Sequence, residues 1–137
     1  MIQIGAEKTY KPLTERENWL AAQIVDIAIC IHKALGPGLL ESIYERCFCY
    51  ELTKRDIPFK KQKVVQLRYD KLIIDEGLRI DILVDDLVVV ELKSQEYSHP
   101  VWEAQLLSYL KLNKNRLGYI INFNVSLMKE GIKRMIL

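Results

Sequence analysis

The sequence has few cysteines, no long apolar run and little net charge. It counts 137 residues with three cysteines, and its formal net charge is +2. No apolar run reaches the roughly 18 residues that a membrane-spanning helix needs, and residues 1–11 lack the apolar core of a signal peptide. We therefore expect a cytoplasmic protein without a membrane partner. The mild positive charge neither requires nor excludes a nucleic-acid partner.

The cysteines do not form a recognisable metal or disulfide framework. Cys30, Cys47 and Cys49 all lie in segments with a helical pattern, and their number is odd. Cys47 and Cys49 are two residues apart, so on a helix they point in different directions. A metal site would need more ligands at better spacing. We expect buried free thiols in a reducing compartment.

The first half of the chain reads as two helices. The length fits a single domain covering residues 1–137, with residues 1–13 as a lead-in segment. Thr14 and Glu17 have the spacing of a capping box, and the turn at 36–38 ends the first helix. Its apolar stripe is Leu20, Ile24, Ile27, Ile31 and Leu35. A second helix is predicted over 39–54, with core positions that include Ile43, Cys47, Tyr50 and Leu52.

The second half predicts a mixed sheet. We expect one further helix over 100–112 and strands over 63–69, 78–84, 87–93, 117–123 and 132–136. The second and third strands are closely linked, so they should be antiparallel neighbours. The crossover helix between the third and fourth strands suggests a parallel pairing somewhere in the sheet. The predicted fold class is α/β, a mixed α+β sheet flanked by helices in the order α-α-β-β-β-α-β(-β).

Two charged residues at the end of an apolar strand are the main functional signal. Glu91 and Lys93 flank Leu92 and follow three valines. Residues two apart on a strand share a face, so the two charges emerge together while Leu92 faces the core. Charges there are costly unless they are paired or bound to a metal. An isolated Glu-X-Lys is more often a solvated strand end with a local ion pair.

Asp81 interrupts the preceding strand, in a run otherwise built for burial. A two-residue loop at Asp85-Asp86 would place Asp81 opposite Val90, on the wrong face. A loop with an odd number of residues, or a bulge, would place Asp81 beside Glu91. We predict the odd loop or the bulge. The alternative is a charge that protects an edge strand from aggregation.

Two helices supply further polar residues. Glu41 is near the start of the second helix, where the helix dipole alone would favour a carboxylate, and Tyr44 shares its face. Gln105 and Tyr109 are four residues apart on the helix after the Glu-X-Lys strand, so they also share a face. A polar helix face with a partly exposed tyrosine would explain that pair equally well.

Together these motifs resemble the PD-(D/E)XK nuclease superfamily, and within it the small bacterial group called GxxExxY proteins. Gly38, Glu41 and Tyr44 supply the motif of that name. The resemblance covers about residues 17–137 and rests on the order and spacing of its motifs. Those motifs are the segments 34–44, 90–93, 103–110, 121–124 and 131–134. The dipeptide Pro-Asp of the superfamily name is absent, because Ile80 precedes Asp81. The resemblance implies an α-β-β-β-α-β core with an extra N-terminal helix.

The resemblance also implies a role for each site residue. Asp81 and Glu91 would bind Mg²⁺ or Mn²⁺ with the backbone carbonyl of Leu92, and Glu41 would bind a second ion or act through water. Lys93 would orient the attacking water or stabilise the developing charge. Gln105 and Tyr109 would hold Lys93 or the phosphate, as in the Gln-x-x-x-Tyr element of RecB-like members.

The implied activity is metal-dependent hydrolysis of phosphodiester bonds, with DNA as the expected substrate. The alternative is a non-catalytic nucleic-acid-binding or accessory module that keeps the fold. A homodimer is a further partner that the resemblance allows. The iron–sulphur cluster of some RecB-like nucleases is excluded, because it needs four cysteines. His32 could lie near the metal, although a contact with free carbonyls at its helix end is the preferred explanation.

Overall fold

The first helix has the predicted start and end. The computed structural model describes residues 11–137, so residues 1–10 of the predicted lead-in segment lie outside the described residues. Helix α1 spans Glu15–Leu35, with Thr14 as its N-cap in a complete capping box and Gly36 as its C-cap. The predicted stripe is buried except for Leu35, which is 42% exposed. No helix of the described residues is long and apolar enough to cross a membrane.

Helix α2 buries a different face from the one predicted. It spans Glu41–Lys54, and its buried side chains are Tyr44, Phe48, Cys49 and Leu52. Ile43 and Tyr50 are 40% and 65% exposed, so their assignment to the core is wrong. The helix carries apolar residues around most of its circumference, and packing against α1 and the sheet selects the buried side.

The cysteines are free, as predicted, but they are not all buried. Cys49 is buried, Cys47 is partly exposed and Cys30 is exposed. Cys30 lies on the solvent side of α1, one residue before the buried Ile31. The expectation of three buried thiols is therefore met by Cys49, only in part by Cys47, and is wrong for Cys30.

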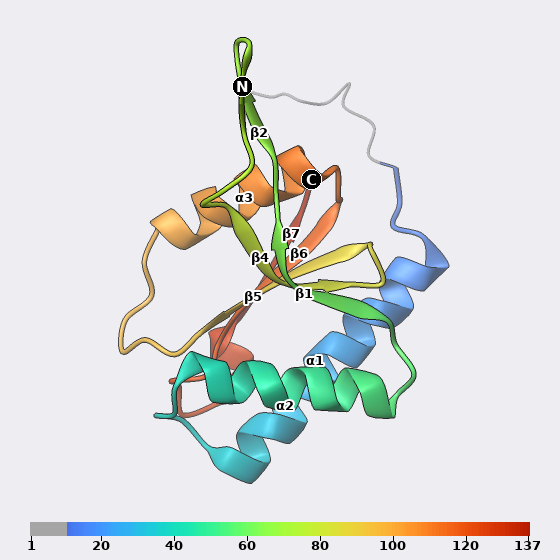
Figure 1. The fold of residues 1–137 in the computed structure, drawn as a ribbon. Coiled ribbons are helices and arrows are strands. Elements are labelled where there is room, and N and C mark those ends of the chain that lie inside the picture. The colour runs from blue at the N-terminus through green and yellow to red at the C-terminus, as the bar shows by residue number, and fades with distance from the viewer. Residues whose placement is uncertain (1–10) are drawn as a thin grey trace, which may run out of the picture.

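A five-stranded mixed sheet forms the centre of the molecule, in the order β1-β4-β5-β6-β7 (Figure 1). The strands are β1 (Phe59–Val64), β4 (Arg79–Val84), β5 (Val88–Lys93), β6 (Leu117–Asn122) and β7 (Ile132–Ile136). Strands β4 and β5 are antiparallel, and β5 and β6 are parallel across helix α3 (Val101–Asn113). Both predicted pairings are confirmed, and so is the mixed sheet flanked by helices.

Helices cover both faces of the sheet. One apolar cluster joins α1 and α2 to one face, and it includes Ile82, Val90 and Leu92. The other joins α3 to the opposite face, and it includes Leu83 and Val89. Neighbouring strand residues thus enter different clusters, as the alternation of a strand requires. A short 3₁₀ helix, Met128–Gly131, leads into β7.

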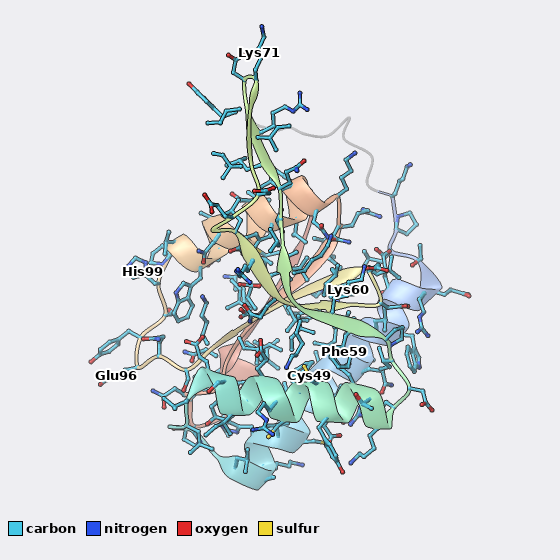
Figure 2. All side chains as sticks on the ribbon, in the orientation of Figure 1. Cys49, Phe59, Lys60, Lys71, Glu96 and His99 are labelled. Carbon is cyan, nitrogen blue, oxygen red and sulfur yellow. The ribbon has the colours of Figure 1, made fainter. Side chains whose placement is uncertain are left out.

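A small hairpin replaces part of one predicted strand. The strand predicted over 63–69 is wrong as a continuous element, because β1 ends at Val64 and β2 (Leu67–Tyr69) pairs instead with β3 (Leu72–Ile74). Lys71 lies at the outer tip of this hairpin, away from the main sheet (Figure 2). Asp70 makes the turn in the left-handed region, with φ of 54°. The core order α-β-β-β-α-β is unaffected.

Candidate functional site

The connection between β4 and β5 has the odd length on which the site depends. Ile82, Leu83 and Val84 pair with Val90, Val89 and Val88, which leaves a three-residue loop of Asp85 to Leu87. The same register continued by one residue brings Asp81 opposite Glu91. The prediction of an odd loop is confirmed. Asp85 and Asp86 make the turn with positive φ, which acidic side chains tolerate better than most.

One hydrogen bond joins Asp81 to Glu91, and a second joins Asp81 to the neighbouring Leu92. The backbone N–H of Asp81 donates to Oε2 of Glu91 at 2.9 Å, and the N–H of Leu92 donates to Oδ2 of Asp81 at 2.9 Å. Side chains thus take the place of the next rungs of the backbone ladder, where regular pairing of β4 and β5 stops. The two carboxylates are held at the point where the strands diverge.

A local irregularity in β1 and β4 turns Asp81 toward this point. Lys61 and Lys63 of β1 pair with Ile82 and Ile80, but the intervening Gln62 has a φ of 50° and makes no such pair. Ile82 packs with the α1–α2 cluster, whereas Ile80 packs with the α3 cluster. A regular strand would put both on one face. The alternation of β4 therefore breaks at Asp81.

Poor solvation of the acid pair raises the pKa of both carboxyl groups. Burial first, and then the negative charge of Asp81, raise the pKa of Glu91 from 4.5 to about 8. Burial also raises the pKa of Asp81, against the opposing effects of the Leu92 N–H and the positive charge of Lys93. The dominant cause is desolvation, which disfavours the charged form. No salt bridge among the described residues neutralises either carboxylate.

Glu41 faces the same region from α2. A cavity of about 160 Å³ is lined by Glu41 and Asp81, together with Leu92, Glu45, Gln62 and Ser42. The charge of Glu41 contributes to the raised pKa of both Asp81 and Glu91. Glu41 therefore lies across a small cavity from Asp81.

Glu45 and Gln62 are cavity residues that sequence reasoning missed. The amide of Gln62 donates to Glu45 Oε2 at 2.7 Å. Glu45 follows Glu41 by four residues, so helical spacing alone places it on the same face and could have identified it. Gln62 enters through its unusual backbone conformation, for which the sequence carries no clear signal.

Tyr44 fixes the turn that precedes Glu41. It is fully buried and stacks on Phe123, with ring centroids 4.2 Å apart. Its hydroxyl donates to the carbonyl of Gly36 at 2.6 Å and accepts from the N–H of Leu39 at 3.2 Å. The two bonds tie both ends of the Gly-Pro-Gly turn to α2. Tyr44 thus orients the start of the helix, where Glu41 lies.

His32 supports the same region from α1. Its Nε2 donates to the carbonyl oxygen of Val125 at 2.8 Å. The predicted contact with a free carbonyl is present, but the carbonyl belongs to the segment after β6 and not to the end of α1. This bond gives His32 a structural explanation without a metal.

Lys93 and Tyr109 interact electrostatically with the acid pair, whereas Gln105 is exposed. The charge of Lys93 lowers the pKa of both acids, and its Nζ lies 5.4 Å from the centroid of the Trp102 ring. Burial and the charge of Glu91 raise the pKa of Tyr109. Gln105 is exposed on α3, and no hydrogen bond within the described part of the chain links it to the site. The ring beside Lys93 is that of Trp102, and the expectation that Gln105 and Tyr109 hold Lys93 or the phosphate stays a prediction.

Asn122 holds the segment that follows the Glu-X-Lys motif. Its Oδ1 accepts from the N–H of Gln95 at 3.1 Å, and its Nδ2 donates to the carbonyl of Gln95 at 3.1 Å. The side chain of Gln95 then reaches Glu41 Oε2 at 3.5 Å. Ser94 donates to the carbonyl of Leu39, which ties the end of β5 to the start of α2. Asn122 and Ser94 therefore position both halves of the site.

The donor set suits a hard divalent cation, although a three-acid cage is not assembled. The buried Glu91 and the half-buried Asp81 are adjacent and have no salt bridge among the described residues. When both ionise they form a concentration of negative charge that such a cation would relieve. Within residues 11–137, no three His, Cys, Asp or Glu side chains are grouped so as to hold one ion. Asp81 and Glu91 are joined by one hydrogen bond, from the backbone N–H of Asp81 to the Glu91 carboxylate, and each carboxylate has an oxygen bound to a backbone N–H. Glu41 stands apart, across the cavity.

The fold and the site define a class. An α-β-β-β-α-β core with two acids and a lysine where two strands diverge is typical of small nuclease-like α/β domains. A family model described as the PD-(D/E)XK nuclease superfamily matches residues 18–135. The chain belongs to this superfamily. No curated protein and no solved structure gives a significant match.

Proposed function

We propose that this domain is a metal-dependent nuclease that hydrolyses phosphodiester bonds in DNA. One observation supports the proposal most. Where β4 and β5 diverge, the buried Glu91 accepts a hydrogen bond of 2.9 Å from the N–H of the half-buried Asp81, whose own carboxylate accepts one of 2.9 Å from the N–H of Leu92. A purely structural acid pair would be expensive in such a place, because burial raises the pKa of both carboxyl groups and the charge of Asp81 raises the pKa of Glu91 further. Perturbed acids of this kind gather at functional sites.

Three residues would hold the cation. Asp81 and Glu91 offer carboxylate oxygens, and the carbonyl of Leu92 is a third oxygen donor beside them, since Leu92 also lines the small cavity. A bound Mg²⁺ or Mn²⁺ would supply positive charge that polarises the phosphate and acidifies a water molecule. Glu41, on the opposite wall, would hold a second cation or orient water. These hard oxygen donors favour Mg²⁺ and Mn²⁺ over softer metals.

Lys93 would work next to the pair. Its ammonium is close enough to lower the pKa of both acids, and it can orient a water molecule or stabilise charge on the phosphate. Tyr109 would support Glu91 from α3, since the two are close enough to interact electrostatically. Gln105 is exposed, so its role would be to touch the substrate.

Fewer observations support DNA as the substrate and the GxxExxY group as the subgroup of this protein. The superfamily implies a nucleic acid, and DNA is our proposal within that class. Two basic residues already have acidic partners at the protein surface: Arg55 pairs with Asp26, and Lys60 pairs with Asp86. The exposed Lys61 and Lys111 remain as contacts for a phosphate backbone. The Gly38-Glu41-Tyr44 motif supports membership in the GxxExxY group.

A cleavage assay tests the proposal. Labelled single-stranded DNA, duplex DNA and RNA are incubated with the protein in Mg²⁺, Mn²⁺ or EDTA. We expect cleavage of DNA with a divalent cation, none in EDTA, and at least a hundredfold loss in Asp81→Asn and Lys93→Met. Glu76→Gln changes an exposed acid in the loop before β4 that does not line the cavity; it is the matched control and should retain activity.

The same assay distinguishes a nuclease from a non-catalytic accessory module. If no substrate is cleaved under any metal condition, or if both site variants keep full activity, the enzyme proposal fails. Binding of nucleic acid without cleavage would instead support an accessory module that keeps the nuclease fold.

A further inference from the structure

A second and larger cavity lies beyond Lys93, on the α3 side of the sheet. Its volume is about 400 Å³, within the size range of small-molecule sites. It is formed by the segment between β5 and α3, the first turn of α3, and the strands β6 and β7. None of the roles proposed for Asp81, Glu91 and Glu41 uses this cavity.

Two residues connect this cavity to the proposed catalytic site. Trp102 lines the cavity, and its ring also lies 5.4 Å from the ammonium of Lys93. Asn122 lines the cavity as well, and it is the register partner of Lys93 in the parallel pairing of β5 and β6. A group bound here would therefore be next to the residue that we assign to the reacting phosphate.

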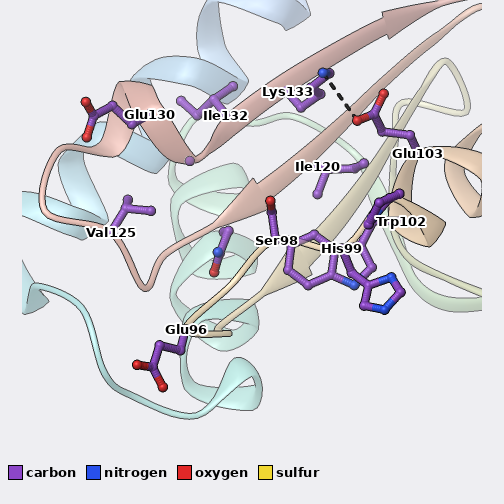
Figure 3. A pocket seen from close by; sticks show the side chains of 13 residues that line it. Glu96, Ser98, His99, Trp102, Glu103, Ile120, Val125, Glu130, Ile132 and Lys133 are labelled. Atoms are coloured by element: carbon purple, nitrogen blue, oxygen red, sulfur yellow. Dashed lines mark ion pairs between the residues drawn. The ribbon is translucent and has the colours of Figure 1, made fainter.

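The lining combines flat apolar surface with a few polar groups. Trp102, Ile120 and Ile132 supply apolar contact, and Ser98, His99 and Asn122 supply hydrogen-bonding groups. In Figure 3, Ser98, His99 and Trp102 lie near the middle of the group, whereas Glu96 and Glu130 stand at its margin. This combination suits a planar ring with polar edges.

The charges of the lining argue against a phosphate as the occupant. Glu96, Glu103 and Glu130 are acidic, and Lys133 is the one lysine or arginine among the lining residues that the structure describes. Lys133 is engaged with Glu103 at 3.3 Å. A nucleobase is uncharged and carries N–H donors, so it would not be repelled by these carboxylates.

We propose that this cavity receives a nucleobase of the substrate, turned out of its stack, while the adjoining phosphate lies at Lys93. The proposal rests on the proposed nuclease function and deepens it. Trp102 would stack on the base, as aromatic side chains do in proteins that bind single strands. Because a base inside a duplex cannot enter, the enzyme would prefer unpaired nucleotides to intact duplex.

The test uses single-stranded DNA oligonucleotides in which one base at a time is replaced by an abasic sugar. With Mn²⁺ present, we expect the abasic sugar at one position beside the cleaved bond to slow cleavage roughly 5- to 150-fold, the effect of losing one stacked base. Trp102→Leu should slow cleavage of the normal strand and abolish this discrimination. Trp19→Leu removes the other tryptophan, which packs with Arg16 on α1, and should leave the discrimination unchanged.

A binding measurement keeps the proposal separate from cleavage. In Trp19→Phe, Trp102 is the sole tryptophan, and its fluorescence is followed while a short DNA strand is added in EDTA. Quenching by a normal strand, and clearly weaker quenching by a fully abasic strand, supports the cavity even if no substrate is cleaved. Equal quenching by both strands, or cleavage that is insensitive to abasic sugars at every position, overturns the proposal.

Discussion

The buried carboxyl group of Glu91 should make the metal-free protein less stable as the pH rises. Its side chain is 6% exposed, and its pKa is raised from 4.5 to about 8. The fold therefore favours the protonated acid. The stability is fully present below pH 4.5, and it falls as the pH rises from there to about 8. Evaluated at pH 7, this shift corresponds to a loss of about 3 kcal/mol.

Glu91→Gln isolates this contribution. The amide oxygen of glutamine can still accept the hydrogen bond from the N–H of Asp81, but the side chain cannot ionise. In EDTA, we expect the variant to be more stable than the wild type by about 3 kcal/mol at pH 7, and equally stable near pH 4. Urea denaturation at several pH values measures both free energies of unfolding. Glu76→Gln, an exposed acid, is the control and should follow the wild type at every pH.

Two results would refute this reasoning. The first is a stability difference that does not change between pH 4 and pH 8, since an un-ionised and an ionised Glu91 would then cost the same. The second is a Glu91→Gln variant that is less stable at pH 7. Added Mn²⁺ should also stabilise the wild type and not the variant, because the cation takes the place of the proton.

Three further substitutions test the supports of the site by thermal or urea denaturation. Tyr44→Phe keeps the stack on Phe123 but loses two hydrogen bonds, so we expect a loss of about 1–2 kcal/mol and weaker cleavage; unchanged stability would contradict the role of the hydroxyl. Gly131→Ala places a Cβ against the carbonyl oxygen of Asn122, and it should cost about 1–3 kcal/mol. Thr14→Ala removes the capping box and should cost about 1 kcal/mol without affecting activity; a loss of cleavage at equal stability would count against this separation.

The pairing of Asp81 with Glu91 could be predicted because side chains on a strand alternate between its two faces with a period of two residues. The alternation of β4 and β5 allows Asp81 to meet Glu91 only through an odd loop or a bulge, and the structure has the three-residue loop. The capping box of α1 was equally readable, because it depends on two residues three positions apart. Short-range rules of this kind need no knowledge of the tertiary structure.

Tertiary contacts determined the features that sequence reasoning missed. Helix α2 has apolar residues on several sides, so only its packing reveals that Tyr44 and Phe48 are buried while Ile43 and Tyr50 are exposed. Asn122 acts by binding the backbone of Gln95, which is 27 residues away. No local sequence pattern predicts a hydrogen bond between residues so far apart in the chain. Gln105 had the expected spacing from Tyr109, but the side chain beside Lys93 is that of Trp102.

The central claim is that Asp81 and Glu91 together hold the divalent cation of a nuclease. The most direct measurement is anomalous X-ray scattering from crystals soaked in Mn²⁺. We predict a peak within bonding distance of carboxylate oxygens of Asp81 and Glu91 and of the Leu92 carbonyl, and its loss in Asp81→Asn. A map without a peak between these two acids at saturating Mn²⁺, or a peak that persists in Asp81→Asn, would contradict the claim.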